Sequence, residues 1–296
     1  VPLDRRAYRD AVTLLTERGL IDHGRLTTYG RAVEAMPVER PWGELLYHAD
    51  PPLVPMVAVA ANIESLHRMT REERELKGLI LPGSDHLTAY NVYAEAVNKH
   101  GYLGEVYGLP RHLFREEIDR WAEGRGVLVK AIEDVALGTA SVYRQIELPL
   151  PARLPYADQK MLELFADLLA KIMPFDLVID EETADGREAR VSRTSVCGSW
   201  GAVAGTLRYF ADRFGVPRAS IEGTQIPERA IRRYARRGPP DVVFERHRRR
   251  EGLMAVRTVV HHGFTLEREV EPLRSPFPDD LADAARRALV QALLAG

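Results

Sequence analysis

The first forty residues alternate between helically spaced apolar positions and one short β-like segment. Apolar residues recur on one stripe over Tyr8–Arg18, which predicts a helix. Residues 22–27 contain a turn and a short strand, and we expect Thr28 to cap a second helix that runs through Met36. This order of helix, small hairpin and helix predicts a winged-helix-like domain over residues 1–41.

The pattern from residue 42 to residue 150 is helical, interrupted by prolines, and predicts a helical bundle. Ser84 precedes a run in which every third or fourth residue is apolar, so it is expected to cap a helix. Two further helices are predicted over Leu113–Glu123 and Val127–Tyr143.

Residues 151–296 mix both periodicities, and the prolines around residue 150 mark the boundary before them. Helices are expected over Ala157–Ile172, Ala202–Phe214 and Pro227–Arg237, with a last helix that ends at Leu294. The alternation at Phe175–Ile179 predicts a strand, which turns at Asp185-Gly186 and returns at Ala189–Val191. Three more strands are expected over Val242–His247, Leu253–Val260 and Phe264–Val270. The predicted fold class is therefore α+β multidomain, with a winged-helix-like N-terminus, a central bundle and a mixed C-terminal domain.

Composition predicts an ordered protein of a reducing compartment. The chain has 296 residues, is 45% hydrophobic and contains a single cysteine, Cys197, which excludes an internal disulfide. The longest apolar run, Leu53–Ala61, is shorter than the roughly 20 residues that span a bilayer, so no membrane partner is expected. No signal peptide is visible, and the location expected is cytoplasmic. The chain begins with Val, which suggests an excised piece.

Positive charge is concentrated late in the chain. Residues 1–200 contain 24 Lys and Arg against 31 Asp and Glu, whereas residues 201–250 contain 12 Arg against 5 acidic residues. Such a cluster attracts phosphate whatever the total charge of the protein.

The predicted helix Pro227–Arg237 is the strongest candidate for a binding site. At helical spacing, one face contains an arginine row: Arg229, Arg232, Arg233, Arg236 and Arg237. Arginine binds phosphate through paired N–H donors, so this row predicts contact with a nucleic-acid backbone. The row is extended by Arg246, Arg248, Arg249 and Arg250. The alternative is a solvated face whose arginines form ion pairs with the acidic N-terminal half.

The remaining motifs predict neither a catalytic centre nor a metal site. Ser84-Asp85-His86 is interpreted as a helix cap, because its members are adjacent in sequence. Cys197 and Ser199 depart from both hydrolase motifs that they approach, and a turn is favoured over a hydrolase nucleophile. His261 and His262 are expected to point to opposite faces of a strand, so they do not share a metal. The acids from Asp180 to Asp185 lack the Ca²⁺-loop pattern.

Two segments carry a resemblance to one family. Leu26–Arg31 (LTTYGR), followed by Ala35–Val38 (AMPV), resembles the degenerate winged helix of DEAH-box helicases. Ser84–Tyr93 (SDHLTAYNVY) is similar to a segment of the helicase-associated, or ratchet, bundle that follows it in that family. The resemblance covers roughly residues 5–150, about half of the chain.

The family's motor motifs are missing. The chain has no G-x-x-x-x-G-K-[ST] loop, no Asp-Glu-Ala-His tetrapeptide and no Q-R-x-G-R-x-G-R segment. The resemblance therefore implies an accessory C-terminal region that contacts single-stranded RNA or DNA and works with helicase motor domains in cis or in trans. No cofactor is expected in this chain, because ATP and Mg²⁺ would bind the missing motor domains.

Three hypotheses follow for the function. The first is a clamp for nucleic acid, with the arginine row open beside a groove next to the helical middle. The second is a protein-interaction scaffold that does not bind nucleic acid. The third, a hydrolase that uses Cys197 or Ser199, is disfavoured.

Overall fold

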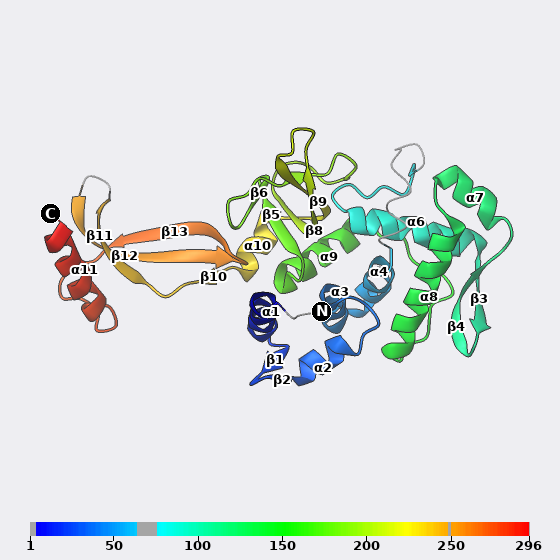
Figure 1. Cartoon of the computed structure of the whole chain (residues 1–296), viewed down its shortest axis with the longest axis horizontal. Helices are drawn as coiled ribbons and strands as arrows, with labels where there is room; N and C mark the ends of the chain where they lie inside the picture. Colours follow the sequence, from blue (N-terminus) through cyan, green and yellow to red (C-terminus); the bar gives the residue numbers. More distant parts are fainter. Residues whose placement is uncertain (1–3, 64–75, 248–249, 296) are drawn as a thin grey trace.

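The chain passes through four successive groups of elements in the computed structural model, which describes residues 4–63, 76–247 and 250–295 (Figure 1). A small N-terminal group is followed by a helical group, a five-stranded sheet and a C-terminal sheet. The mixed α+β class expected from the sequence is confirmed.

The N-terminal group contains two helices joined by a small antiparallel hairpin, in the order predicted. Its elements are α1 (Arg5–Glu17), β1 (Ile21–Asp22), β2 (Arg25–Leu26) and α2 (Thr28–Glu34). Thr27, not Thr28, caps α2, since its hydroxyl accepts a 2.9 Å hydrogen bond from the backbone N–H of Gly30. A Cβ on Gly30 would overlap the carbonyl of Leu20, which explains the glycine in LTTYGR.

The helical group has one β-hairpin that the sequence pattern did not indicate. Its elements are α3 (Arg40–His48), the 3-10 turn η1 (Pro51–Leu53), α4 (Val54–Ala60), α6 (Asp85–His100), β3 (Gly101–Val106), β4 (Leu109–Phe114), α7 (Ile118–Arg125) and α8 (Val129–Gln145). The expectation of a helix from Leu113 was wrong, because Tyr107 and Gly108 adopt φ of 52° and 73° and form a tight turn. The helix in this region starts only at Ile118.

The apolar core of the helical group extends past residue 150 to include α9 (Gln159–Ile172). Tyr90 and Tyr93 of α6 and Phe165 of α9 are all fully buried. The proline-rich segment just before α9 is bound to α6, because Asn91 and Asn98 exchange hydrogen bonds with the backbone of Ala157 and Leu154. The proline-rich segment is thus packed against the bundle.

The second β region is a mixed sheet with the strand order β6-β5-β8-β9-β7. Its strands are β5 (Asp176–Ile179), β6 (Glu182–Thr183), β7 (Arg190–Val191), β8 (Ala202–Ala211) and β9 (Pro217–Ile226). The helix expected over Ala202–Phe214 is wrong, since β8 pairs along its whole length with β9. The expected return strand is also misassigned: β5 returns through β6, and β7 pairs parallel to β9.

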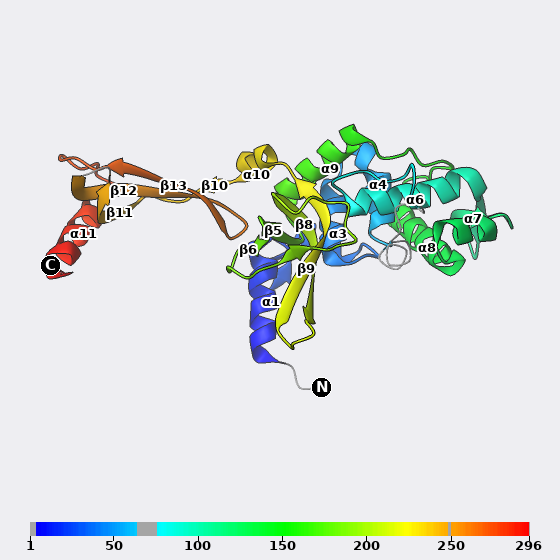
Figure 2. The same cartoon turned by 90° about the horizontal axis from the view of Figure 1, so that it is seen from above.

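The C-terminal group is a small sheet that extends away from the rest of the molecule (Figures 1 and 2). It contains β10 (Arg236–Arg237), β11 (Asp241–His247), β12 (Arg250–His261), β13 (Phe264–Pro272) and α11 (Ala282–Ala295). The helix α10 (Glu228–Tyr234) precedes this sheet and packs on α9, with Ala230 and Ile231 buried in the main core. The three predicted strands are confirmed, with β12 central between β11 and β13. A separate apolar cluster that includes Val242, Leu253 and Ala285 joins α11 to this sheet. Within the described ranges, no helix is both long and apolar enough to cross a membrane.

Candidate functional site

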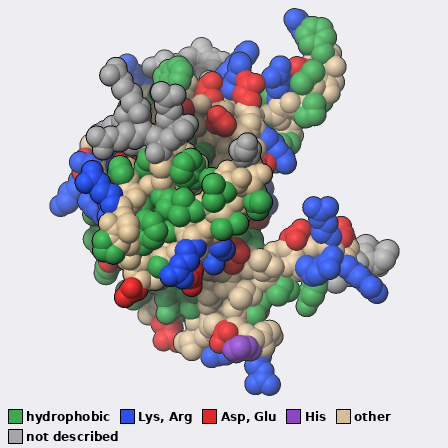
Figure 3. Space-filling model, turned by 90° about the vertical axis from the view of Figure 1, so that its left-hand side faces the viewer, with side chains coloured by type: hydrophobic (Ala, Val, Ile, Leu, Met, Phe, Trp, Pro, Cys, Tyr) green, Lys and Arg blue, Asp and Glu red, His purple; other side chains and the backbone are tan. Residues whose placement is uncertain are grey.

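A large groove, which we call the central groove, lies where the four groups of elements meet. Its volume is about 1350 Å³, and its walls come from α1, α2, α3, the start of α6, the end of α9, β5, β8 and the turn between β12 and β13. Figure 3 shows the side of the molecule on which α1 and the β8–β9 hairpin project as two arms with an open hollow between them. Small-molecule pockets usually measure roughly 300–1,000 Å³, so this groove has room for an extended ligand.

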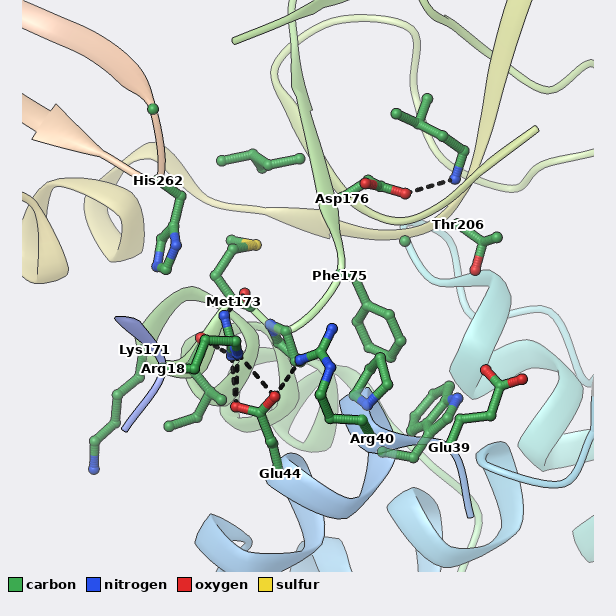
Figure 4. A pocket seen from close by; sticks show the side chains of 18 of the residues that line it. Arg18, Glu39, Arg40, Glu44, Lys171, Met173, Phe175, Asp176, Thr206 and His262 are labelled. Carbon is green, nitrogen blue, oxygen red and sulfur yellow. Dashed lines mark hydrogen bonds and ion pairs between the residues drawn. The ribbon is translucent and has the colours of Figure 1, made fainter. Parts of the chain in front are cut away.

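The floor of the groove is an ion-pair network around Glu44 of α3, whose side chain is only 1% exposed (Figure 4). The Arg18 Nε donates to its two carboxylate oxygens at 2.8 and 2.9 Å, Arg40 also pairs with it, and the Tyr29 hydroxyl donates at 3.1 Å. Arg18 further donates to the backbone carbonyls of Ile172 and Met173 at the end of α9. The network therefore joins α1, α2, α3 and α9.

The charges of this network keep Glu44 ionised. Burial opposes ionisation, but the hydrogen bonds and charges of Arg18 and Arg40 outweigh it and lower the pKa of Glu44 below its usual range. Burial, together with the Glu44 charge, raises the pKa of Tyr29 well above its usual range. Two guanidinium groups and one carboxylate leave the floor with a net positive charge.

One wall of the groove is aromatic. The ring of Phe175 lies 4.9 Å from that of Trp42 and 5.6 Å from that of His86, measured between ring centroids. Trp42 is buried, whereas Phe175 is partly exposed to the groove. An exposed aromatic edge beside cationic side chains is the combination that single-stranded nucleic acid uses for stacking.

The Ser84-Asp85-His86 motif joins α6 to the five-stranded sheet. Ser84 caps α6, as predicted, through a 3.0 Å bond from the backbone N–H of Leu87. The Asp85 carboxylate accepts bonds from the Ser195 hydroxyl at 2.5 Å and the Gly223 backbone N–H at 2.9 Å. These hydrogen bonds hold the start of α6 against the five-stranded sheet.

Cys197 has the surroundings of a structural thiol. Burial and the nearby Asp85 carboxylate raise its pKa to about 12. Its Sγ lies 3.4 Å from the Gly223 carbonyl oxygen, to which it can donate. A thiol that stays protonated is a poor nucleophile, which counts against the hydrolase hypothesis.

The arginine row is not a continuous helical face. The helix α10 ends at Tyr234, and Arg236 and Arg237 lie in β10, which pairs with β12. The predicted helix to Arg237 was therefore too long. Gly238 and two prolines follow Arg237, and they cannot continue a helix.

Four members of the row pair with carboxylates of this same chain. The pairs are Arg229–Glu163 at 3.5 Å, Arg232–Glu228 at 2.8 Å, Arg233–Asp167 at 2.6 Å and Arg237–Glu269 at 2.9 Å. The acidic partners lie on α9, on α10 itself and on β13. All four arginine side chains remain between 53% and 69% exposed, so these surface ion pairs offset part of the charge of the row but leave it accessible.

The fifth member of the row differs from the others. Arg236 lines the central groove and has no carboxylate partner among the residues that the structure describes, and the same holds for Lys171 at the end of α9. Of the predicted extension, Arg248 and Arg249 lie outside the described residues, as do the side chains of Arg246 and Arg250. The structure therefore separates Arg236 from the rest of the predicted site.

The β8–β9 hairpin is a feature that sequence reasoning missed. Gly205 and Gly223 are paired across it, and a Cβ on Gly223 would overlap the Ala204 carbonyl, so the two strands approach closely there. Towards its tip, Tyr209 and Phe210 are well exposed. The β-branched and aromatic residues of Ala202–Ala211, followed by the turn-forming residues Asp212 and Gly215, were the available signal.

Comparisons with known proteins identify the fold. No protein-family model and no curated protein matches the chain. A crystal structure of the Escherichia coli DExH-box NTPase HrpB matches with a TM-score of 0.54 and 15% identity over 98% of this chain. A crystal structure of the Escherichia coli DEAH/RHA helicase HrpB matches with a TM-score of 0.49 and 14% identity over 96% of it.

The chain spans only 30% of the first HrpB chain and 29% of the second. The first likeness covers almost all of the present chain, including residues 151–296, which the sequence resemblance did not reach. It shows a fold shared with one part of a longer protein.

Proposed function

We propose that this chain is the accessory, non-motor region of a DExH-box-type helicase, and that its central groove contacts single-stranded nucleic acid. ATP and Mg²⁺ would act in motor domains, present in cis or in trans. The chain itself would bind the nucleic-acid strand along the central groove.

The observation that carries the proposal is the composition of the central groove within a fold that resembles part of HrpB. Among the described residues, Lys171 and Arg236 line the groove without a carboxylate partner, and the partly exposed ring of Phe175 lies in one wall. The lining as a whole contains five Lys and Arg and seven Asp and Glu, so the local placement of these two cations carries the proposal rather than the net charge. Nucleic-acid backbones are bound mainly by Lys and Arg contacts to phosphate, and bases stack on aromatic rings. Because α1 and β8 lie on opposite sides of the groove, a change in the distance between them would change the affinity for a bound strand.

A surface for motor domains is available on α1. No residue of α1 is fully buried, Tyr8 exposes 57% of its surface, and Val12 and Leu15 on the same stripe are only partly buried. A helix with an uncovered apolar side gains stability from a partner. We propose that a motor domain covers this side.

The proposal is tested with the whole chain and a fluorescent oligouridylate of about 12 nucleotides, a length within the usual site size. Fluorescence anisotropy between about 50 and 200 mM salt should show affinity that falls steeply with salt. The variant Lys171→Glu should weaken binding several-fold and reduce the salt slope by about one. The matched variant Arg233→Glu changes a cation of the arginine row and should bind as the wild type does.

The opposite pattern would overturn the assignment to the groove. If Arg233→Glu abolishes binding and Lys171→Glu does not, the arginine row is the interface. If the wild type does not bind at low salt, the protein-interaction scaffold replaces the proposed function.

A further inference from the structure

We propose that the turn between β12 and β13 forms, with the groove wall beside it, a proton-linked binding site for a phosphodiester anion, built from His262 and Arg236. Arg236 pairs across the strands with Val260, two residues before His262. The inference rests on the proposed function, since it names the contact that one phosphate of a strand in the central groove would make. It adds that this contact strengthens as the pH falls.

The geometry of the turn presents His262 to the groove. His262 and Gly263 adopt φ of 43° and 87°, and His261 pairs with Phe264 across the turn. A Cβ on Gly263 would lie 3.1 Å from the Cβ of Ala184, so the turn sits against the loop that follows β6. Figure 4 shows the His262 ring on the same side of the groove as Lys171, Met173 and Arg18.

The cations near this turn are of two kinds. Most N–H donors of Arg18 are used by Glu44 and by carbonyls of α9, so Arg18 contributes mainly its positive charge. Arg236 and Lys171 have no carboxylate partner in the described part of the chain. Their N–H donors are available to an anion.

Burial and neighbouring positive charges both disfavour the protonated form of His262. Burial is the main cause that lowers its pKa to about 4, and His261, Arg18 and Arg236 lower it further. No acidic group appears among these causes. His262 is therefore neutral at pH 7, and an anion bound beside it would raise its pKa towards the ordinary value.

His261 supplies a second, independent sign of a ligand. Its side chain is 2% exposed, and its Nε2 is buried with no hydrogen-bond partner among the described residues. Its ring is otherwise hydrogen bonded to the backbone of Tyr234, and burial lowers its pKa. A buried polar atom without a partner is uncommon and costly, so this nitrogen is suited to a bound group.

Several acidic groups line the same groove, and two of them have partners within the chain. Asp185 pairs with Arg187 at 2.8 Å, and Asp176 accepts a bond from the Leu207 backbone N–H at 3.2 Å. The groove is also lined by other titratable or charged groups, which come from every element packed around the turn. From the N-terminal and helical groups they are Glu17, Arg18, Tyr29, Glu39, Arg40, Glu44, His48, Asp85 and His86. From the later elements they are Lys171, Arg208, Tyr209, Glu222 and Tyr234. Among these groups, His48 has a pKa lowered by burial and by the charge of Lys171, so its protonated form is disfavoured.

The experiment compares His262→Gln with the control His23→Gln. His23 also precedes a glycine at a left-handed turn, with φ of 46°, but it is fully exposed on the β1–β2 hairpin. Anisotropy with the same oligouridylate is measured between about pH 5.5 and 7.5, where histidine titrates. Wild type and His23→Gln should bind more tightly as the pH falls, by up to about tenfold per pH unit for one proton taken up. His262→Gln should show a flatter profile.

The outcomes separate this inference from the proposed function. Oligouridylate binding with the same pH profile in His262→Gln would overturn the anion site and leave the function intact. Absence of binding by the wild type would overturn the function. The anion site is then tested with inorganic pyrophosphate, by following the His262 ring resonances by NMR: an upward shift of its pKa supports the site, and no shift refutes it.

Discussion

The Glu44 network offers the sharpest test of how the groove is held together. In Glu44→Gln, an amide replaces a carboxylate that is 1% exposed and that binds Arg18, Arg40 and Tyr29. The amide presents an N–H₂ group to one guanidinium and leaves two cations without a counter-charge. Breaking one side of a buried ion pair costs roughly 3–5 kcal/mol, and we take about 3 kcal/mol because Arg40 is partly exposed.

The assay is thermal unfolding by calorimetry, combined with oligouridylate binding at a temperature where the variant is folded. A loss of about 3 kcal/mol corresponds to roughly 6–12 °C in melting temperature for a unit of 150–250 residues. Binding should also weaken, because Arg18 fixes α1 to the end of α9.

The control is Glu95→Gln. Glu95 is 3% exposed and binds Lys99, Arg125 and Trp121, so its loss should cost similar stability, but it does not line the groove. Equal loss of binding in both variants would refute a specific role of the Glu44 network. A stability loss below about 1 kcal/mol, the level of a surface pair, would refute the burial argument.

Three further predictions follow from local geometry. Because the pKa of Glu44 is lowered, its ion pairs contribute stability above the carboxyl's ordinary pKa of 4.5, and wild type should lose more stability than Glu44→Gln when acid titrations pass below that value. Gly223→Ala should destabilise the five-stranded sheet by more than about 1 kcal/mol, measured by urea unfolding, because its Cβ meets the Ala204 backbone. Gly252→Ala in β12, where a Cβ meets nothing within 4 Å and φ is not positive, should cost less. Cys197 should resist thiol reagents at pH 8 in the folded chain and react only on unfolding; rapid labelling of folded protein would contradict its raised pKa.

The sequence was informative where structure depends on neighbours along the chain. Ser84 acts on an N–H three residues away, so its cap could be predicted. The partners of Asp85 are Ser195 and Gly223, more than a hundred residues distant, and no local pattern connects them. The same limit explains why a helix was expected over Ala202–Phe214: local composition allowed one, but pairing with β9 decided the conformation.

The arginine row illustrates the same limit for a functional site. Helical spacing placed Arg233 on a shared face, but it could not reveal that Asp167 of α9 lies 2.6 Å away. Nor could it show that Arg236 leaves the helix and reaches the groove beside His262. Clustering of charge in the sequence therefore could not show which arginines pair within the chain, as Arg233 does, and which line the groove, as Arg236 does.

Hydrogen–deuterium exchange of the whole chain, with and without oligouridylate, tests the central groove as the binding surface most directly. The account predicts that added strand protects amides in α1, in β8 and in the turn between β12 and β13. Protection confined to α10, or no protection at low salt, would contradict it.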